Sequence, residues 1–127
     1  MVLIDANVIL RHVLKDNVEM AQQVEDLLKT NKVYAGLEVI AEVVYVLEKV
    51  YKVERNDIVN TLRVFFSHSS ISVESNEVLD ISFSLFDAGK FDFVDTVLYA
   101  KNRVYGYDVF TFDKKLNAVL QSRITEE

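Results

Sequence analysis

Four acidic residues occupy positions where an α/β chain could build a catalytic site. Asp5 and Asp113 each end a short apolar run that has the character of a strand. Glu42 and Asp95 lie in two segments with helical patterning between these runs. In a parallel α/β sheet, the carboxyl ends of the strands and the turns after them form one edge, where sites are built. Acids from distant parts of the sequence can therefore meet at that edge.

Carboxylates held close together favour a cation, because they raise each other's pKa unless a positive ion lies between them. A hard divalent cation with oxygen ligands, Mg²⁺ or Mn²⁺, suits such a set. A bound metal lowers the pKa of a water molecule and neutralises phosphate during in-line attack. We therefore expect a phosphoryl-transfer site with one or two metal ions. The expected metal ligands are Asp5, Asp95, Asp113 and, directly or through water, Glu42, and the residues expected to position them are Asn7 and Thr111.

Three of the acids also have a helix-capping alternative. Asp5 can cap the helix that follows it, although Asn7 could serve as the cap instead and leave Asp5 free. Asp113 likewise precedes a helix. Asp95 stands three residues after Asp92, a spacing that resembles a capping box. At a helix N-terminus its carboxylate would also lie in a positive field, which keeps it ionised and able to bind a metal.

Glu42 is placed less clearly by the sequence. On a helical wheel it lies nearly opposite Ile40, away from the main apolar stripe. This periodicity reads as a solvated position, although Ala41 and Val43 make that side of the helix less polar than an ordinary surface. A residue in a cleft would have the same pattern, so the sequence does not choose between the two.

Composition excludes several classes of site. The chain has no cysteine, which rules out disulfides, thiolate zinc sites and a cysteine nucleophile. Its two histidines, His12 and His68, have no nucleophile elbow nearby, which argues against a serine–histidine–aspartate triad. The net charge of −6 argues against tight, nonspecific duplex binding. It does not argue against a nuclease, which reaches phosphate through a metal.

Length and patterning indicate a single domain over residues 1–127. No apolar run approaches the roughly 20 residues that span a bilayer. The chain opens directly on a strand-like segment and shows no basic region followed by an apolar region and a small-residue cleavage site, as a signal peptide would have. We therefore expect no membrane association and a cytoplasmic protein.

Strands alternate with helical stretches, which predicts a three-layer α/β fold with a mainly parallel sheet. The strands are continuous apolar runs, as expected when both faces of a sheet are covered. The expected strands are Val2–Asp5, Val33–Ala35, Ile71–Val73 and Tyr107–Phe112, with a short edge strand or a frayed tail after Arg123. The expected helices are Asn7–Val13, Val18–Thr30, Leu37–Tyr51, a helix that begins at Arg55 or Asn56, Asn76–Ala88, Asp92–Val104, and Lys114–Leu120. The helix Leu37–Tyr51 has an apolar stripe that includes Val50 and Tyr51. Gly106 is expected to end the helix Asp92–Val104.

With these residues placed, the chain resembles a PIN-domain ribonuclease, and most of all the VapC-like toxins of bacterial and archaeal toxin–antitoxin pairs. The family motifs that match, in order and over nearly the whole chain, are Leu3–Leu10, Ile40–Leu47, Phe93–Ala100 and Thr111–Asp113. One departure is visible. A serine or threonine often precedes the glutamate helix in this family, and here the segment is Ala35-Gly36-Leu37.

The resemblance implies a PIN-like fold with a central, mainly parallel sheet of four or five strands, and Mg²⁺ or Mn²⁺ dependence. It also implies RNA as substrate, a frequent homodimer, and a cognate antitoxin that folds onto the toxin and blocks the site. Hydrolysis by a metal-activated water would leave 5′-phosphate and 3′-hydroxyl ends. Whether the RNA is tRNA, rRNA or mRNA stays open, because surface shape and loops decide that choice.

Two other functions fit the chain less well. A catalytically inactive PIN-like module could bind RNA or protein without turnover, and the presence of all four acids argues against it. A receiver-type phospho-acceptor domain would need an acidic pair at the first strand. Asp5 has no adjacent acid, and the run Ile71–Val73 ends in Glu74 rather than an aspartate.

Overall fold

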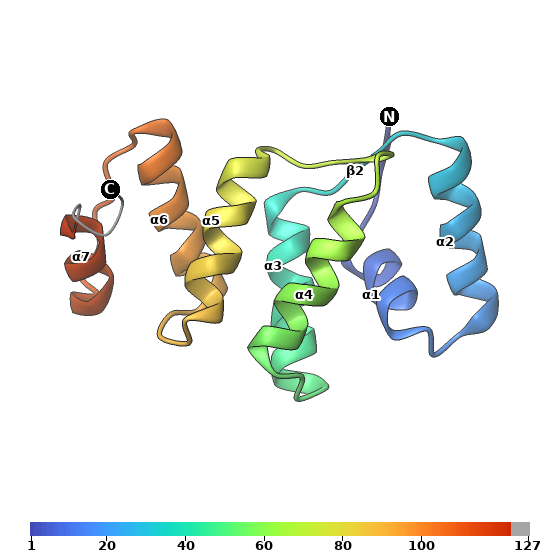
Figure 1. Ribbon diagram of the computed structural model, residues 1–127, viewed down its shortest axis with the longest axis horizontal. Coiled ribbons are helices and arrows are strands. Elements are labelled where there is room, and N and C mark those ends of the chain that lie inside the picture. Colours follow the sequence, from blue (N-terminus) through green and yellow to red (C-terminus); the bar gives the residue numbers. More distant parts are fainter. Residues whose placement is uncertain (123–127) are drawn as a thin grey trace. The chain divides into compact units, whose positions relative to one another are not determined.

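The computed structural model describes residues 1–122 and forms two compact units, residues 1–74 and residues 75–127 (Figure 1). The first unit contains β1 (Val2–Leu3), α1 (Ala6–Leu14), α2 (Val18–Thr30), β2 (Val33–Tyr34), α3 (Leu37–Tyr45), the π-helical turn η1 (Val46–Val50), α4 (Arg55–Phe66) and β3 (Ile71–Ser72). The second unit contains α5 (Asn76–Asp87), α6 (Phe93–Tyr105) and α7 (Lys114–Gln121). The tail expected as an edge strand or frayed end lies outside the described residues.

The sheet of the first unit is parallel, as predicted, with strand order β1-β2-β3. Val2 lies opposite Val33, and Val33 lies opposite Ile71 on its other side. The backbone N–H of Ile4 continues the ladder by donating to the carbonyl of Tyr34 over 3.2 Å. Because the strands are parallel, their carboxyl ends share one edge, and the chain leaves that edge into α1 after β1 and into α3 after β2.

The segment Tyr107–Phe112, expected as a further strand, makes no strand pairing among residues 1–122. Its residue types have the β-propensity of a strand, but a strand also needs a partner backbone, and propensity does not supply one. The described part of the chain therefore shows a mostly helical α/β fold with a three-stranded parallel sheet. The larger sheet and the three layers stay a prediction.

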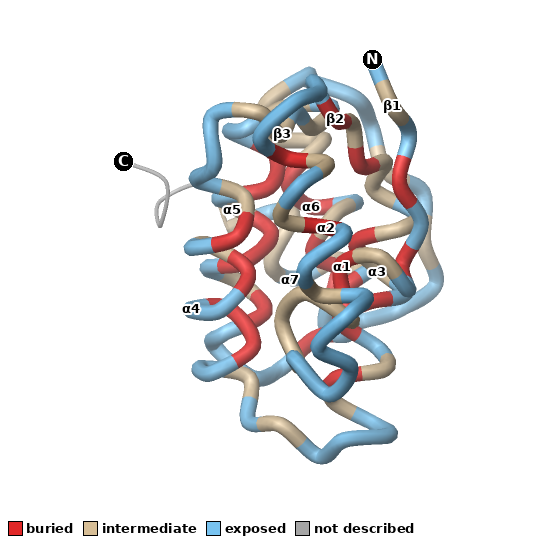
Figure 2. Tube along the Cα trace, turned by 90° about the vertical axis from the view of Figure 1, so that its right-hand side faces the viewer, coloured by how far each residue is buried: buried red, intermediate tan, exposed pale blue. Residues whose placement is uncertain are grey.

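The core of the first unit lies between α1 and the helices α2, α3 and α4. Figure 2 shows buried residues recurring along one side of α4, the pattern of an amphipathic helix. The expected apolar stripe of α3 is buried as far as Leu47. Fully buried side chains of this unit include Ile9, Val33, Ile40, Val43, Val44, Ile58 and Leu62.

The expectation that Val50 and Tyr51 continue this stripe is wrong. Their side chains are 64% and 46% exposed. After Tyr45 the helix widens into η1, where the N–H of Tyr51 bonds to the carbonyl of Val46 over 3.1 Å. This i→i+5 ladder changes the rotation per residue, so the last apolar residues leave the buried face.

The second unit has its own core, in which α6 packs against α5 and α7 (Figure 1). Phe91, Tyr99 and Leu116 form a buried cluster. Gly106 ends α6 in a left-handed conformation with φ +75°, which confirms its predicted role as the helix-ending glycine. The guanidinium of Arg103 donates to the carbonyl of Val119 over 3.2 Å and so ties α6 to α7.

None of the helices within residues 1–122 has the length and apolar character needed to cross a bilayer.

Candidate active site

Asp5 lies at the carboxyl end of β1 and caps α1. Its Oδ1 atom accepts a hydrogen bond from the backbone N–H of Val8 over 3.2 Å. Asn7 lies within the first turn of the helix, so the cap is Asp5 and not Asn7. Capping uses one carboxylate oxygen and leaves lone pairs on the other for a metal. Asn7 makes no hydrogen bond to Asp5 in the described structure.

A hollow of about 400 Å³ opens beside Asp5. Its walls come from the ends of β1 and β2 and from the first turns of α1 and α3. The edge of the sheet that the sequence predicted as a site is therefore formed, and it carries an acid. The hollow is lined by Leu3, Ile4, Asp5, Val8, Tyr34, Gly36, Glu38 and Val39.

Glu38 is an acid of this hollow that the sequence reasoning missed. It stands in the first turn of α3, and its carboxylate folds back over Gly36, where an added Cβ would overlap it. The Glu38 carboxylate thus lies over Gly36, in the segment Ala35-Gly36-Leu37 that precedes α3. One signal was available, because Glu38 precedes Glu42 by four residues and so shares its helix face.

Glu42 is exposed on α3, one turn after Glu38, which is one of the two placements that the sequence left open. It does not line the hollow beside Asp5. Its side chain makes no hydrogen bond to another described residue, so the carboxylate is not committed to a structural role.

Asp95 lies in the first turn of α6, in the second unit. Asp92 caps this helix through its backbone position only, so the capping box suggested by the spacing does not form. The pKa of Asp95 is raised, first by burial, then by the negative charges of Asp113 and Asp92, while Lys115 opposes the shift. The fold thus brings Asp95 into the electrostatic field of Asp113.

Asp113 is the N-cap of α7, with its Oδ1 atom accepting from the backbone N–H of Leu116 over 2.8 Å. The hydroxyl oxygen of Thr111 accepts from the backbone N–H of Asp113 over 3.1 Å. The side chain of Asn117 in turn donates to the carbonyl of Thr111 over 2.8 Å. Thr111 therefore positions the Asp113 backbone, and Asn117 is a positioning residue that the sequence reasoning missed.

The four acids are divided between the two units. Asp5 and Glu42 belong to the first unit, and Asp95 and Asp113 belong to the second. Among the described residues of either unit, no group of three or more histidines, aspartates and glutamates is arranged to hold a metal ion. The Asp95–Asp113 set still has the chemistry of a cation site, because a partly buried carboxylate beside a second negative charge is stabilised by a positive ion.

Comparison with known proteins gives one match. The family profile of the PIN domain, a nuclease-type fold, matches residues 2–120 and so takes in all four acids. Searches of curated proteins and of solved structures each returned no match. Because the profile extends over almost the whole chain, this protein belongs to the PIN domain family.

Proposed function

We propose that the protein is a divalent-metal-dependent ribonuclease that hydrolyses RNA phosphodiester bonds. The observation that carries this function is the match of the PIN domain profile to residues 2–120. The raised pKa of Asp95, caused first by burial and then by the charge of Asp113, supports it, because a divalent cation would stabilise the ionised carboxylate. PIN domains are nuclease-type domains, and an acidic site reaches an anionic backbone only through a cation.

In this function Asp5, Asp95 and Asp113 bind one or two Mg²⁺ or Mn²⁺ ions, and Glu42 binds directly or through water. When bound, the metal supplies an activated water and a positive charge at the scissile phosphate. Thr111 holds the Asp113 backbone, and Asn7 has the proposed role of positioning Asp5. The expected products carry 5′-phosphate and 3′-hydroxyl ends.

One site made of all four acids requires a larger sheet than the three strands described. We propose that Tyr107–Phe112 supplies a further strand of a three-layer, four- or five-stranded sheet. Its run of apolar residues and its position just before Asp113 support this assignment.

The resemblance to VapC-like toxins supports a biological role as the toxin of a toxin–antitoxin pair. The proposed partners are a cognate antitoxin that blocks the site and a second copy of the chain in a homodimer. The proposed location is the cytoplasm.

Cleavage of total RNA by purified, partner-free protein tests the activity. We expect cleavage with Mg²⁺ or Mn²⁺, none with EDTA, and a loss of at least about 100-fold in Asp5→Asn and Asp95→Asn. Asparagine keeps the capping ability of Asp5, so that variant should fold normally. Asp57→Asn, an exposed acid in the first turn of α4, is the matched control and should cleave normally. Cleavage that survives EDTA, or products with 2′,3′-cyclic phosphate ends, would contradict the metal mechanism.

The second candidate is a PIN-like module that binds RNA or protein without turnover. It is favoured by the placement of Glu42 outside the hollow that Asp5 lines. A folded protein that binds RNA but shows neither Mn²⁺ binding by calorimetry nor cleavage would assign this function instead.

A further inference from the structure

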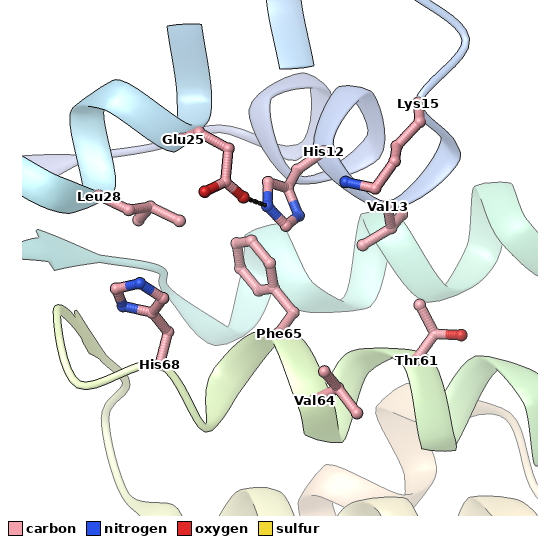
Figure 3. Close-up of a pocket in the computed structure, with 9 residues that line it drawn as sticks. All are labelled: His12, Val13, Lys15, Glu25, Leu28, Thr61, Val64, Phe65 and His68. Atoms are coloured by element: carbon pink, nitrogen blue, oxygen red, sulfur yellow. Dashed lines mark hydrogen bonds and ion pairs between the residues drawn. The ribbon is translucent and has the colours of Figure 1, made fainter. Parts of the chain in front are cut away.

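Both histidines of the chain line a second hollow, near the opposite end of α1 from Asp5 (Figure 3). It has a volume of about 400 Å³ and lies wholly within the first unit, with walls from α1, α2 and α4. This size falls within the range of small-molecule sites. None of the four proposed metal-binding acids lines it, so it is separate from the proposed nuclease site.

The charges of this hollow differ from those of the whole chain. The chain carries a net charge of −6, yet the hollow has a single acid, Glu25. Glu25 accepts a 2.6 Å hydrogen bond from Nε2 of His12. The pKa of Glu25 is lowered first by the hydrogen bond from His12, and the positive charges of Lys15 and Lys29 add to this effect. Lys15 and the nearby Lys29 therefore place positive charge beside this carboxylate, and the Lys15 ammonium group can attract an anion.

Two of the lining residues offer donors. Lys15 ends α1 with φ +52°, a left-handed position where glycine or asparagine is usual, and its ammonium group makes no hydrogen bond to another described residue. Nδ1 of His68 accepts from the backbone N–H of Ser70 over 3.2 Å. The neutral ring of His68 therefore carries its proton on Nε2, which is left to donate.

An aromatic ring lies between these donors. Figure 3 shows Lys15 and His68 on opposite sides of Phe65. Phe65 contacts the ring of His12 edge to face, with centroids 5.2 Å apart, and Leu28 and Val64 extend the apolar wall. Phe65 is only 4% exposed, so the accessible part of this wall is formed mainly by Val64. A ligand that matches this arrangement has a flat ring to lie over the wall, an anionic group at one end, and an acceptor at the other.

We propose that this hollow binds a nucleotide, with its phosphate at Lys15 and its base over the apolar wall beside Phe65, within reach of the His68 N–H. The same chemistry is presented by a free mononucleotide and by the 5′-phosphorylated end of an RNA chain. Binding does not depend on the nuclease function, because the hollow contains none of the acids assigned to cleavage.

The two histidines make the test direct. In the full chain with EDTA present, we would follow the imidazole Hε1 NMR signals of His12 and His68 during titration with AMP, adenosine or inorganic phosphate. EDTA removes any metal-bridged binding of phosphate to the acidic site. We expect AMP to shift both signals saturably, and adenosine and phosphate each to need at least about tenfold higher concentrations. Signals that AMP leaves unmoved at millimolar concentration, or that phosphate alone shifts equally well, would overturn the assignment.

A matched set of variants separates binding from folding. Lys15→Asn removes the charge but keeps a residue that tolerates the left-handed backbone, so it should fold normally. We expect it to weaken AMP binding about tenfold. Lys52→Asn makes the same change at the other left-handed lysine, φ +57°, which does not line the hollow, and should bind AMP normally. Equal affinities for the two variants would contradict the role of Lys15.

Short RNAs identify the source of the nucleotide. In EDTA, a 5′-phosphorylated trinucleotide that binds at least as tightly as AMP, and more tightly than its 5′-hydroxyl form, would assign an RNA end. Binding of AMP but of neither trinucleotide would assign a free nucleotide. Binding of none of the three would overturn the proposal.

Discussion

Two of the acids, Asp5 and Asp113, have a structural role that does not compete with metal binding. Each accepts one backbone N–H at the start of a helix, through Oδ1 in both cases. A carboxylate offers about four acceptor positions, so one hydrogen bond leaves most of them free. Capping and metal ligation are thus compatible, and the cap positions the carboxylate before a metal arrives.

The two roles of Asp113 can be separated by substitution. Asp113→Asn keeps a capping oxygen, whereas Asp113→Ala removes it. We expect both variants to lose cleavage, but only the alanine variant to lose about 1 kcal/mol of unfolding free energy, measured by urea denaturation without metal. Equal destabilisation by the two substitutions would show that the capping bond contributes nothing.

Asp95 is expected to lower the stability of the metal-free protein. Because its folded-state pKa is raised, the folded state binds the proton more tightly than the unfolded state does. Its favourable contribution is complete below the unfolded pKa of about 3.9 and is lost as the pH rises through the folded value. Asp95→Asn should therefore raise the melting temperature at pH 7 by a few degrees, with the gain shrinking towards pH 3. A variant that melts below the wild type at pH 7 would contradict this.

At the scale of the elements, helix ends and helix pairs are held by side chains. Arg55 at the start of α4 bonds to Glu48 of η1 through Nε over 2.7 Å. His12 of α1 and Glu25 of α2 form the 2.6 Å ion pair that joins these two helices. The apolar faces determine which helices pack, and these polar contacts add specific connections between them.

The His12–Glu25 contact predicts a pH dependence. The pKa of Glu25 is lowered, chiefly by the hydrogen bond from His12. The ionised Glu25 carboxylate therefore adds to the free energy of unfolding above its unfolded-state pKa, and this stabilisation is lost as the pH falls through its folded-state pKa. We expect the wild type to lose more stability than Glu25→Gln between pH 6 and about pH 3. Thermal melts across this range provide the measurement. Glu19→Gln, an exposed change on the same helix, is the control and should follow the wild type.

At the scale of the whole molecule, the proposed metal ligands come from both units. A ligand that binds only the folded chain raises its melting temperature. A metal ion held by all four acids would be such a ligand. We expect excess Mn²⁺ to raise the melting temperature of the wild type by several degrees. The same rise should disappear in Asp5→Asn and in Asp95→Asn, one acid from each unit, and persist in Asp57→Asn. Retention of the full rise in either acid variant would exclude that acid from the site.

The sequence alone determined most of the local structure. The spacing of apolar residues predicted α2 with its observed bounds, Val18–Thr30, and Gly106 predicted the end of α6. It also predicted the parallel pairing of the three described strands and the position of Asp5 at their carboxyl edge. The helix bounds depend on hydrogen bonds and periodicities within a few residues of each other, so a short stretch of sequence contains their cause. The parallel arrangement was predictable for another reason, namely the alternation of strands and helices along the chain.

Only the tertiary structure decided the features that depend on distant residues. It selected Asp5 over Asn7 as the cap, brought Glu38 to the Asp5 hollow, and placed His12 and His68 in one hollow although 56 positions separate them (68 − 12). It also left Tyr107–Phe112 without strand pairing in the described residues. Each of these outcomes is set by which surfaces pack together, and a residue's own neighbours in sequence do not specify its partners in space.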